Sequence, residues 1–381
     1  MNIKPAVLRL LTASGAVVLS SQTFALEPAS INLGPLDFTP VLQVTTGHDD
    51  NIRANNQEDS SWVTSIQPTF TLGAAGLKSE YQVSYSFAHD YFHSFSSEKT
   101  TDHFLDAAAF FEFDSRNRLL LGVDFTDTTE FNDANTPNDE FRTRGFNALY
   151  SYGVQSARFN LDLGFDTNRT RTQNSINSDK DLNASLISST LYYRVSPRTR
   201  LLAEVRHSKQ DYTVNDALDS TNRNYLLGAQ WEATAFTTGS IRIGRGEKDF
   251  KDATKDDVSR NMWELGLAWE PLTYSRFNVT TRSSIEEGDE GADSIKQQLY
   301  RVGWNHDWNG FISTTAAYSF LDKDYDNGRN DKNHLTSIGL NYAVDRWVDI
   351  GLRYEYTDNN SSVATENYTR NQILLTLTVS L

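Results

Sequence analysis

Apolar and polar residues alternate along most of this chain with a period of two. Between residues 81 and 87, Tyr, Val, Tyr and Phe occupy the odd positions, and Gln and Ser occupy the even ones. The final segment, 373–381, has Ile, Leu, Leu, Val and Leu at its odd positions, separated mostly by Thr and Ser. Successive side chains of a strand point to opposite faces, so this period gives each strand one apolar and one polar face. The pattern predicts an all-β chain of amphipathic strands.

The alternation divides the chain into about eighteen segments, each near the ~9–11 residues that a tilted strand needs to cross a membrane. Stretches rich in Asp, Asn, Ser and Lys separate them. The predicted strands are 37–48, 62–73, 79–92, 102–113, 118–129, 141–152, 157–169, 181–195, 199–210, 222–233, 238–247, 258–270, 275–285, 294–308, 311–322, 333–344, 347–357 and 367–381.

The connections between these strands alternate in length. Long, polar ones are expected at 49–61, 130–140, 170–180, 211–221 and 323–332, and short ones at 115–117, 196–198, 309–310 and 345–346. Short periplasmic turns and longer outer loops are typical of outer-membrane barrels. The sequence therefore predicts a transmembrane antiparallel up-and-down β-barrel of about eighteen strands in a bacterial outer membrane, with both ends on the periplasmic side.

The first residues read as a targeting segment. Lys4 and Arg9 give a positive start, residues 10–20 are apolar or small, and Thr23-Phe24-Ala25 is a small-x-small cleavage site. The apolar stretch is shorter than the ~20 residues that a spanning helix needs, which disfavours an uncleaved anchor. The expected organisation is a signal peptide at 1–25, a short periplasmic lead at 26–36 and the barrel at 37–381.

Composition narrows the possibilities further. The chain has no Cys, which excludes disulfides, thiolate metal sites and a lipid-bearing N-terminal Cys. Its formal charge is −15, and removal of residues 1–25, which hold Lys4 and Arg9 and no acidic residue, would give −17. Such an acidic chain does not favour nucleic acid as a partner. The negative mean hydropathy fits a soluble secreted protein as well as a barrel, which shows only alternate residues to lipid.

A barrel of this size is too wide for side chains to fill, so an aqueous channel is expected. The predicted inward positions are mixed in charge. The candidate transport residues are Arg206, Arg242, Arg276, Arg282, Arg301, Arg353, Glu264 and Glu355, with Glu112, Asp124, Asp162, Glu204 and Glu232 as further offsetting acids. Charged rings can select ions or charged sugars. Alternatively, opposite charges on neighbouring strands pair and stiffen the wall, and a register slip of one residue would reverse a strand's faces.

No motif indicates catalysis, a cofactor or a metal. His89 and His93 are four residues apart but lie in a predicted strand, where that spacing keeps them distant. No G-x-S-x-G motif supports a barrel hydrolase. The acidic runs 49–51 and 322–328 are interpreted as solvated outer loops; the second weakly resembles a calcium loop but lacks the closing Glu. Weak binding of divalent ions that bridge these loops to lipopolysaccharide is compatible with both the solvated-loop and the calcium-loop interpretation.

Two short segments resemble the opening of the putative β-barrel porin 2 family: 44–52, with Gly47-His48-Asp49-Asp50-Asn51, and 66–72, with a Pro-x-apolar-x-Leu pattern from Pro68. The resemblance implies an outer-membrane barrel, and many members are associated with exopolysaccharide or capsule export, and hence with biofilm polymers. It also implies partners: outer-membrane lipid and lipopolysaccharide, a polysaccharide substrate, periplasmic export components and the barrel-assembly machinery. One departure is Leu381, where such barrels usually end in Phe or Trp.

Three functions remain open at this point. The first is a pore that passes an exopolysaccharide or capsular polysaccharide outward through many weak contacts. The second is a general or small-solute diffusion porin. The third, an enzyme or a surface adhesin built on the same barrel, has no supporting motif in the sequence, and we expect a protein that is not an enzyme.

Overall fold

The computed structural model describes residues 30–131, 138–154, 156–173, 175–234, 236–289 and 291–380, so the predicted signal peptide lies outside the described residues. Nearly all of the described chain is strand. The strands are β1 (Ile31–Asn32), β2 (Asp37–Asp49), β3 (Ser61–Ala75), β4 (Ser79–Phe92), β5 (Thr100–Glu112), β6 (Asn117–Glu130), β7 (Asp139–Tyr152), β8 (Phe159–Thr172), β9 (Leu182–Ser196), β10 (Thr199–Tyr212), β11 (Ser220–Thr234), β12 (Thr237–Phe250), β13 (Val258–Leu272), β14 (Ser275–Glu287), β15 (Ser294–Asp307), β16 (Ile312–Tyr325), β17 (Asn330–Asp345), β18 (Val348–Ser361) and β19 (Tyr368–Ser380).

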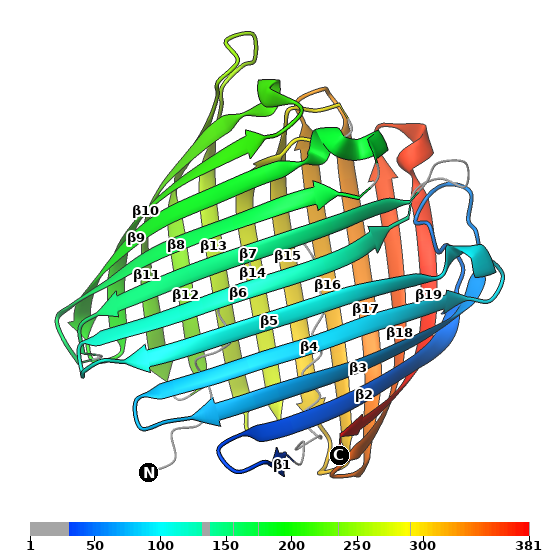
Figure 1. The fold of residues 1–381 in the computed structure, drawn as a ribbon, viewed down its shortest axis with the longest axis horizontal. Coiled ribbons are helices and arrows are strands. Elements are labelled where there is room, and N and C mark those ends of the chain that lie inside the picture. Colours follow the sequence, from blue (N-terminus) through cyan, green and yellow to red (C-terminus); the bar gives the residue numbers. More distant parts are fainter. Residues whose placement is uncertain are drawn as a thin grey trace.

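Strands β2 to β19 form one closed barrel of 18 strands (Figure 1). Each strand pairs antiparallel with the next in sequence, and β19 pairs antiparallel with β2, from Gln372 opposite Asp49 to Ser380 opposite Val41. This closure leaves β2 and β19 with no unpaired edge. The predicted all-β, antiparallel, up-and-down barrel is confirmed. The two-residue β1 adds a small further pairing to the start of β2.

The two faces of the wall differ as the alternation predicts. On β10 and β11, Val205 and Leu227 are 48% and 65% exposed, whereas their neighbours Glu204 and Leu226 are 7% and 2% exposed. Side chains on the convex face of a barrel diverge, while those on the concave face converge and cover one another. The exposed apolar face is therefore the outer one, a surface suited to lipid, and the face of Glu204 lines the interior.

Short and long connections lie at opposite ends of the barrel. The short-turn mouth holds the connections 76–78, 113–116, 153–158, 197–198, 235–236, 273–274, 308–311 and 346–347. The long-loop mouth holds 50–60, 93–99, 131–138, 173–181, 213–219, 251–257, 288–293, 326–329 and 362–367. In outer-membrane barrels the short turns face the periplasm. Exposed aromatic rings of the turns and strand ends gather at this mouth, as expected of an interfacial girdle: Phe113, Tyr152, Phe159, Trp269, Tyr274, Trp308, Phe311 and Trp347.

Most strands are longer at the long-loop mouth than the sequence predicts. The clearest case is the polar stretch expected as a loop at 323–332, where β16 and β17 continue to the pair of Asp324 and Asn330 and leave only 326–329 as a turn. The prediction of a long loop there is wrong. Backbone pairing does not depend on apolar side chains, so a hairpin can extend past the membrane with polar residues on both faces.

The long-loop mouth is braced by short 3₁₀ helices and ion pairs. The helices are η1 (Ser96–Glu98), η2 (Ser175–Lys180), η3 (Asp216–Leu218) and η4 (Ala364–Glu366). Lys251, just after β12, lies 2.8 Å from both Asp211 and Asp219, and these hydrogen bonds raise the pKa of its ammonium group.

Among the residues that the structure describes, no helix has the length and apolar character needed to cross a membrane.

Close strand approach depends on glycine at mid-wall. A Cβ added at Gly228 would collide with the backbone oxygen of Ile241, whereas one added at Gly303, on the same inner face, would meet nothing within 4 Å. We expect Gly228→Ala to lower the free energy of unfolding by about 1–3 kcal/mol, the usual cost of forcing extra atoms into a packed site. Gly303→Ala should change it little. Urea unfolding in lipid vesicles measures both, and equal stabilities would contradict the expectation.

Candidate functional site: the inner wall of the barrel

A cluster of four charged side chains occupies the inner wall of β10, β12 and β13. Arg206 Nε lies 2.5 Å from Glu204 Oε1, and its two terminal nitrogens lie 2.5 and 3.1 Å from the carboxylate of Glu264. Arg242 Nε lies 2.8 Å from Glu204 Oε2, and its Nη1 lies 3.8 Å from Glu264 Oε2. Two cations and two anions thus balance one another. We refer to these four residues as the charge cluster.

Inner-face glycines make this cluster possible. Arg206 and Glu264 belong to β10 and β13, which are separated by β11 and β12. In the register of β11 and β12, Gly228 lies opposite Arg242, and Gly244 lies opposite Leu226. Because glycine has no side chain, the long Arg side chains can cross the intervening strands along the concave wall. The cluster also confirms that these residues face the interior, where side chains of non-adjacent strands converge.

The other predicted transport residues also lie on the inner face, and most have a carboxylate partner. Arg276 lies 2.6 Å from Glu270, Arg282 lies 3.1 Å from Glu286, and Arg353 lies 3.5 Å from Glu355. The alternative reading of the sequence, in which opposite charges pair along the wall, therefore describes most of these residues.

Arg301 is different from the other seven candidates. It lies on β15, opposite Thr280 and Ser319, and its Nε is buried without a hydrogen-bond partner. Within the described residues it has no ion pair with a carboxylate. An unpaired guanidinium in a wet channel keeps its field available to passing solutes.

Arg301→Gln is expected to lower the preference of the channel for anions. In water, a unit charge about 4 Å from a passing ion contributes about 1 kcal/mol, so the chloride-to-potassium permeability ratio should fall by up to about fivefold. The reversal potential of single channels across a KCl gradient measures this ratio. Arg245→Gln is the matched control, because Arg245 lies on the outer face of β12 with its side chain 54% exposed. Equal shifts in both variants would contradict a local role.

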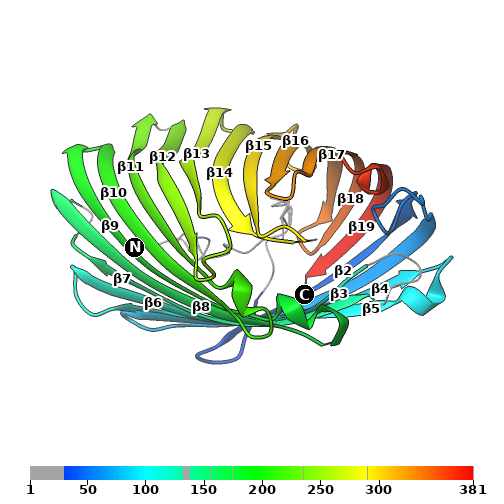
Figure 2. The same ribbon diagram turned by 90° about the horizontal axis from the view of Figure 1, so that it is seen from above.

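An acidic stripe lies on the wall opposite Arg301. Asp106 and Asp124 are directly opposed on β5 and β6, and Asp166 lies on the same inner face of β8. In the view along the barrel, β5 and β6 are on the lower wall and β14 and β15 on the upper one (Figure 2). Among the described residues these three carboxylates have no ion-pair partner. Of the three, the sequence singled out only Asp124, because the register that aligns it with Asp106 is visible only in the paired strands.

A third part of the inner wall is uncharged at mid-height. Strands β19, β2, β3 and β4 place hydroxyl and amide side chains there, and neighbours are linked by hydrogen bonds such as Thr45 to Thr376 at 3.0 Å and Thr71 to Ser84 at 3.1 Å. We call this surface the hydroxyl stripe; its members are Thr45, Ser65, Gln67, Thr69, Thr71, Ser84, Ser86 and Thr376. Asp90, directly opposite Ser65 on β4, bounds the stripe toward the long-loop mouth.

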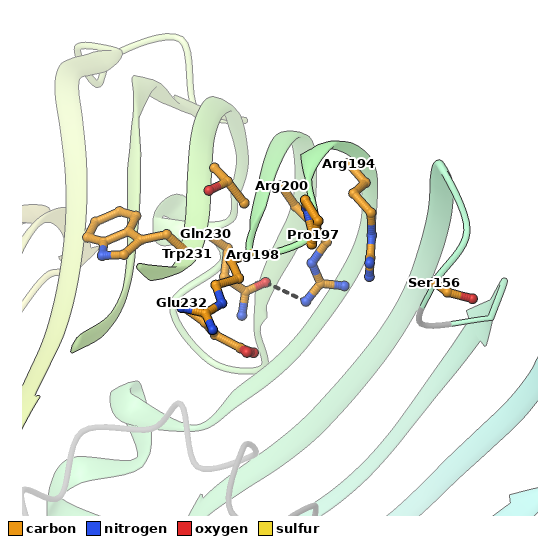
Figure 3. Close-up of a pocket in the computed structure, with 9 residues that line it drawn as sticks. Ser156, Arg194, Pro197, Arg198, Arg200, Gln230, Trp231 and Glu232 are labelled. Atoms are coloured by element: carbon orange, nitrogen blue, oxygen red, sulfur yellow. Dashed lines mark hydrogen bonds between the residues drawn. The ribbon is translucent and has the colours of Figure 1, made fainter. Parts of the chain in front are cut away.

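A cavity of about 460 Å³ lies in the wall at the short-turn mouth (Figure 3). Arg200 Nη2 donates a hydrogen bond of 2.8 Å to Gln230 Oε1 beside it. We call this cavity the arginine pocket; its lining residues are Ser156, Arg194, Pro197, Arg198, Thr199, Arg200, Gln230, Trp231 and Glu232. The alternation of apolar and polar residues does not predict this cavity, although the Arg-rich segment 198–200 is a visible signal.

The acidic run 49–51 is not the solvated loop that the sequence suggested. Asp49 and Asn51 are only 1% and 0% exposed. Arg370 Nε lies 3.0 Å from both oxygens of Asp49, and Asp50 accepts hydrogen bonds of 2.6 and 2.7 Å from the backbone and side chain of Asn371. These contacts fasten β2 to β19, so the carboxylates serve the closure of the barrel.

Most of the second acidic run, which the sequence suggested to be a solvated loop, is strand. Asp322 and Asp324 belong to β16 and pair in register with residues of β17. Within the described part of the chain, no group of three or more His, Asp or Glu side chains is arranged to hold a metal ion.

Comparison with known proteins agrees with this geometry. A structure of OpdK from Pseudomonas aeruginosa with vanillate shares 12% identity, over 90% of this chain and 98% of that one, with a TM-score of 0.50. A second OpdK structure (OccK1) shares 13% identity, over 91% of this chain and 98% of that one, with a TM-score of 0.51. The FrpB iron transporter of Neisseria meningitidis shares 11% identity, with a TM-score of 0.51. The match covers 85% of this chain but only 62% of the transporter chain.

At these identities the likeness concerns the fold alone, which is that of outer-membrane channels. No curated protein matches the chain. The model of one protein family, described as putative beta-barrel porin 2, matches residues 25–381. The closed barrel, its apolar outer face and this match place the protein in the bacterial outer membrane. The chain belongs to the putative beta-barrel porin 2 family.

Proposed function

We propose that this barrel conducts a polysaccharide from the periplasm through the outer membrane to the cell surface. The observation that carries the proposal is the hydroxyl stripe, a continuous surface of hydrogen-bonding groups without charge at mid-height. A sugar chain presents many hydroxyl groups, and translocation requires contacts that are numerous and individually weak, because a strong site would hold the polymer.

Two further features support a polymer as the substrate. The charge cluster neutralises its own charges, so it offers a polymer little net charge on that part of the wall. The loop 50–60, the longest connection, is fastened to the rim: Asn51 Nδ2 donates a hydrogen bond of 3.0 Å to the backbone oxygen of Thr369. Periplasmic export components are the partners that such a conduit would need, and no catalytic role is proposed.

A small-solute channel is the second candidate, and one observation favours it. Asp106 and Asp124 face Arg301 from opposite walls, which sets up a field across the channel that would orient small charged or dipolar solutes. The OpdK structure contains vanillate, but the likeness to this chain concerns the fold and gives no substrate.

The decisive experiment measures polysaccharide in a strain that lacks the gene, with surface and periplasmic polymer quantified separately. Export through this barrel predicts loss of surface polymer, its retention in the periplasm, and recovery on complementation with the wild-type gene. Unchanged surface polymer would overturn the proposal and leave the small-solute channel, which uptake by liposomes that contain the purified barrel then tests.

A further inference from the structure

The arginine pocket brings three guanidinium groups together at the short-turn mouth. Arg194 comes from β9, Arg198 from the turn 197–198, and Arg200 from β10 (Figure 3). Arg194 and Arg200 are directly opposed in the strand register. Directly opposed side chains on neighbouring strands are close neighbours, so the two guanidinium groups share one part of the wall.

The contacts of these arginines leave cationic character in the pocket. Arg200 bonds the neutral amide of Gln230, and its guanidinium carbon lies 5.0 Å from the centre of the Tyr192 ring. Among the described residues, neither Arg198 nor Arg200 has an ion pair with a carboxylate. Glu232 is the one acid among the pocket's lining residues, against three arginines.

The pocket belongs to the channel side of the wall. Arg200 follows the two-residue alternation of Glu204 and Arg206, so it shares their inner face, and Gln230 is its direct partner on β11. Trp231 lies on the opposite face of β11 and points away from Arg200 and Gln230 in the close-up (Figure 3). A dissolved ligand in the mouth therefore reaches Arg194 and Arg200 more directly than a lipid headgroup outside the barrel does, and Arg198 lies in the turn beside them.

A neighbouring turn extends the basic surface. Arg158 lies in the connection 153–158, and its backbone oxygen accepts a hydrogen bond of 2.8 Å from Arg194 N. Arg116 lies in the connection 113–116, and its backbone oxygen accepts a hydrogen bond of 2.7 Å from Gly153 N. Arg158 thus extends the basic surface of the pocket into the next turn, on a chain whose formal charge is −15, whereas Asp114 offsets Arg116 in the connection 113–116. The basic surface of the pocket and Arg158 raises the local concentration of anions at this mouth.

We propose that the arginine pocket is an intake site that binds a carboxylate of an acidic polysaccharide as the polymer enters from the periplasm. The inference rests on the proposed function and adds the charge class of its substrate. Arginine presents a planar fork of donors that matches a carboxylate with two parallel hydrogen bonds. The cavity of about 460 Å³ is within the range of small-ligand sites.

Binding of a defined oligosaccharide tests the inference directly. The probes are a hexamer of galacturonic acid and, as its uncharged counterpart, maltohexaose, added to the purified full-length barrel in detergent. Arg198→Gln should weaken binding of the acidic hexamer about tenfold, because a charge-assisted hydrogen bond is lost, and should leave binding of maltohexaose unchanged. Arg198→Lys, which keeps the charge but not the fork, should give an intermediate affinity.

Arg346→Gln is the matched control. Arg346 is exposed in a turn of the same kind at the same mouth, but it does not line the pocket. Equal weakening by Arg198→Gln and Arg346→Gln would overturn a defined site in favour of a general basic field. Binding of phosphatidylglycerol vesicles, but not of the acidic hexamer, in a manner sensitive to Arg198→Gln would overturn it in favour of a lipid site.

The secretion experiment separates this inference from the proposed function. If the deletion strain loses surface polymer while Arg198→Gln binds the acidic hexamer as tightly as wild type, the intake site fails and the conduit stands. If the deletion strain keeps its surface polymer, the conduit and the intake role fail together, whereas tenfold weaker binding in Arg198→Gln would still establish an anion site.

Discussion

Replacing Glu204 by Gln is expected to lower the free energy of unfolding by about 3 kcal/mol, the lower end of the range for breaking a buried ion pair. The side chain of Glu204 is 7% exposed and accepts hydrogen bonds from both Arg206 and Arg242. Its neutralisation leaves two guanidinium groups facing the single carboxylate of Glu264. We place the effect at the lower end because the arginine side chains are 22% and 23% exposed and keep some contact with water in the channel.

Urea unfolding of the barrel in lipid vesicles measures this loss. Glu247→Gln is the control, because Glu247 makes one contact of 3.7 Å with Arg245, and the two side chains are 43% and 54% exposed. Such a weakly held pair should contribute less than about 1 kcal/mol. If both variants unfold at the same urea concentration, the charge cluster does not have the stabilising role assigned to it.

Asp49→Asn is expected to impair closure of the barrel. Asp49 accepts hydrogen bonds from Arg370 on β19, from Gln372 Nε2 at 2.9 Å and from Asn51 N at 3.0 Å, and it is 1% exposed. Loss of its charge leaves Arg370 without its carboxylate at the junction of the first and last barrel strands. The expected cost is about 3 kcal/mol, and it falls on the one strand pairing that joins distant parts of the chain.

The fraction of closed barrel in outer membranes measures this effect, through the heat-dependent mobility of the protein in gel electrophoresis. Asp256→Asn is the control, because Asp256 is exposed in the connection 251–257 and has no hydrogen bond among the described residues. A normal closed fraction for Asp49→Asn would show that backbone pairing of β2 and β19 is sufficient for closure.

The strands and their order follow from local patterns, which explains why the sequence predicts them well. The range 79–92 coincides with β4, and the predicted strand 37–48 begins at the same residue as β2. The prediction fails at the long-loop mouth, where Asp324 and Asn330 extend a hairpin. Apolar alternation reports contact with lipid, so it ends where the membrane ends, whereas backbone pairing continues.

The eight candidate transport residues show the same division. Alternation alone places Arg301 and Arg353 on the inner face, because the apolar outer face fixes the register of each strand. It gives no partners, since Arg206 and Glu264 meet across two intervening strands. The structure separates Arg301 from the paired arginines, and it brings Asp106 and Asp124 together opposite it.

The sequence by itself determined the barrel, the number of its strands, their faces and the mixed charge of the inner wall. These properties depend on the period of two and on turns between neighbours in sequence, which are local. Only the tertiary structure decided how Asp49 closes the seam, which charges neutralise one another, and that Arg194, Arg198 and Arg200 surround one pocket. These properties depend on strand register and on the curvature of the wall, and both arise only when the strands pair into a closed barrel.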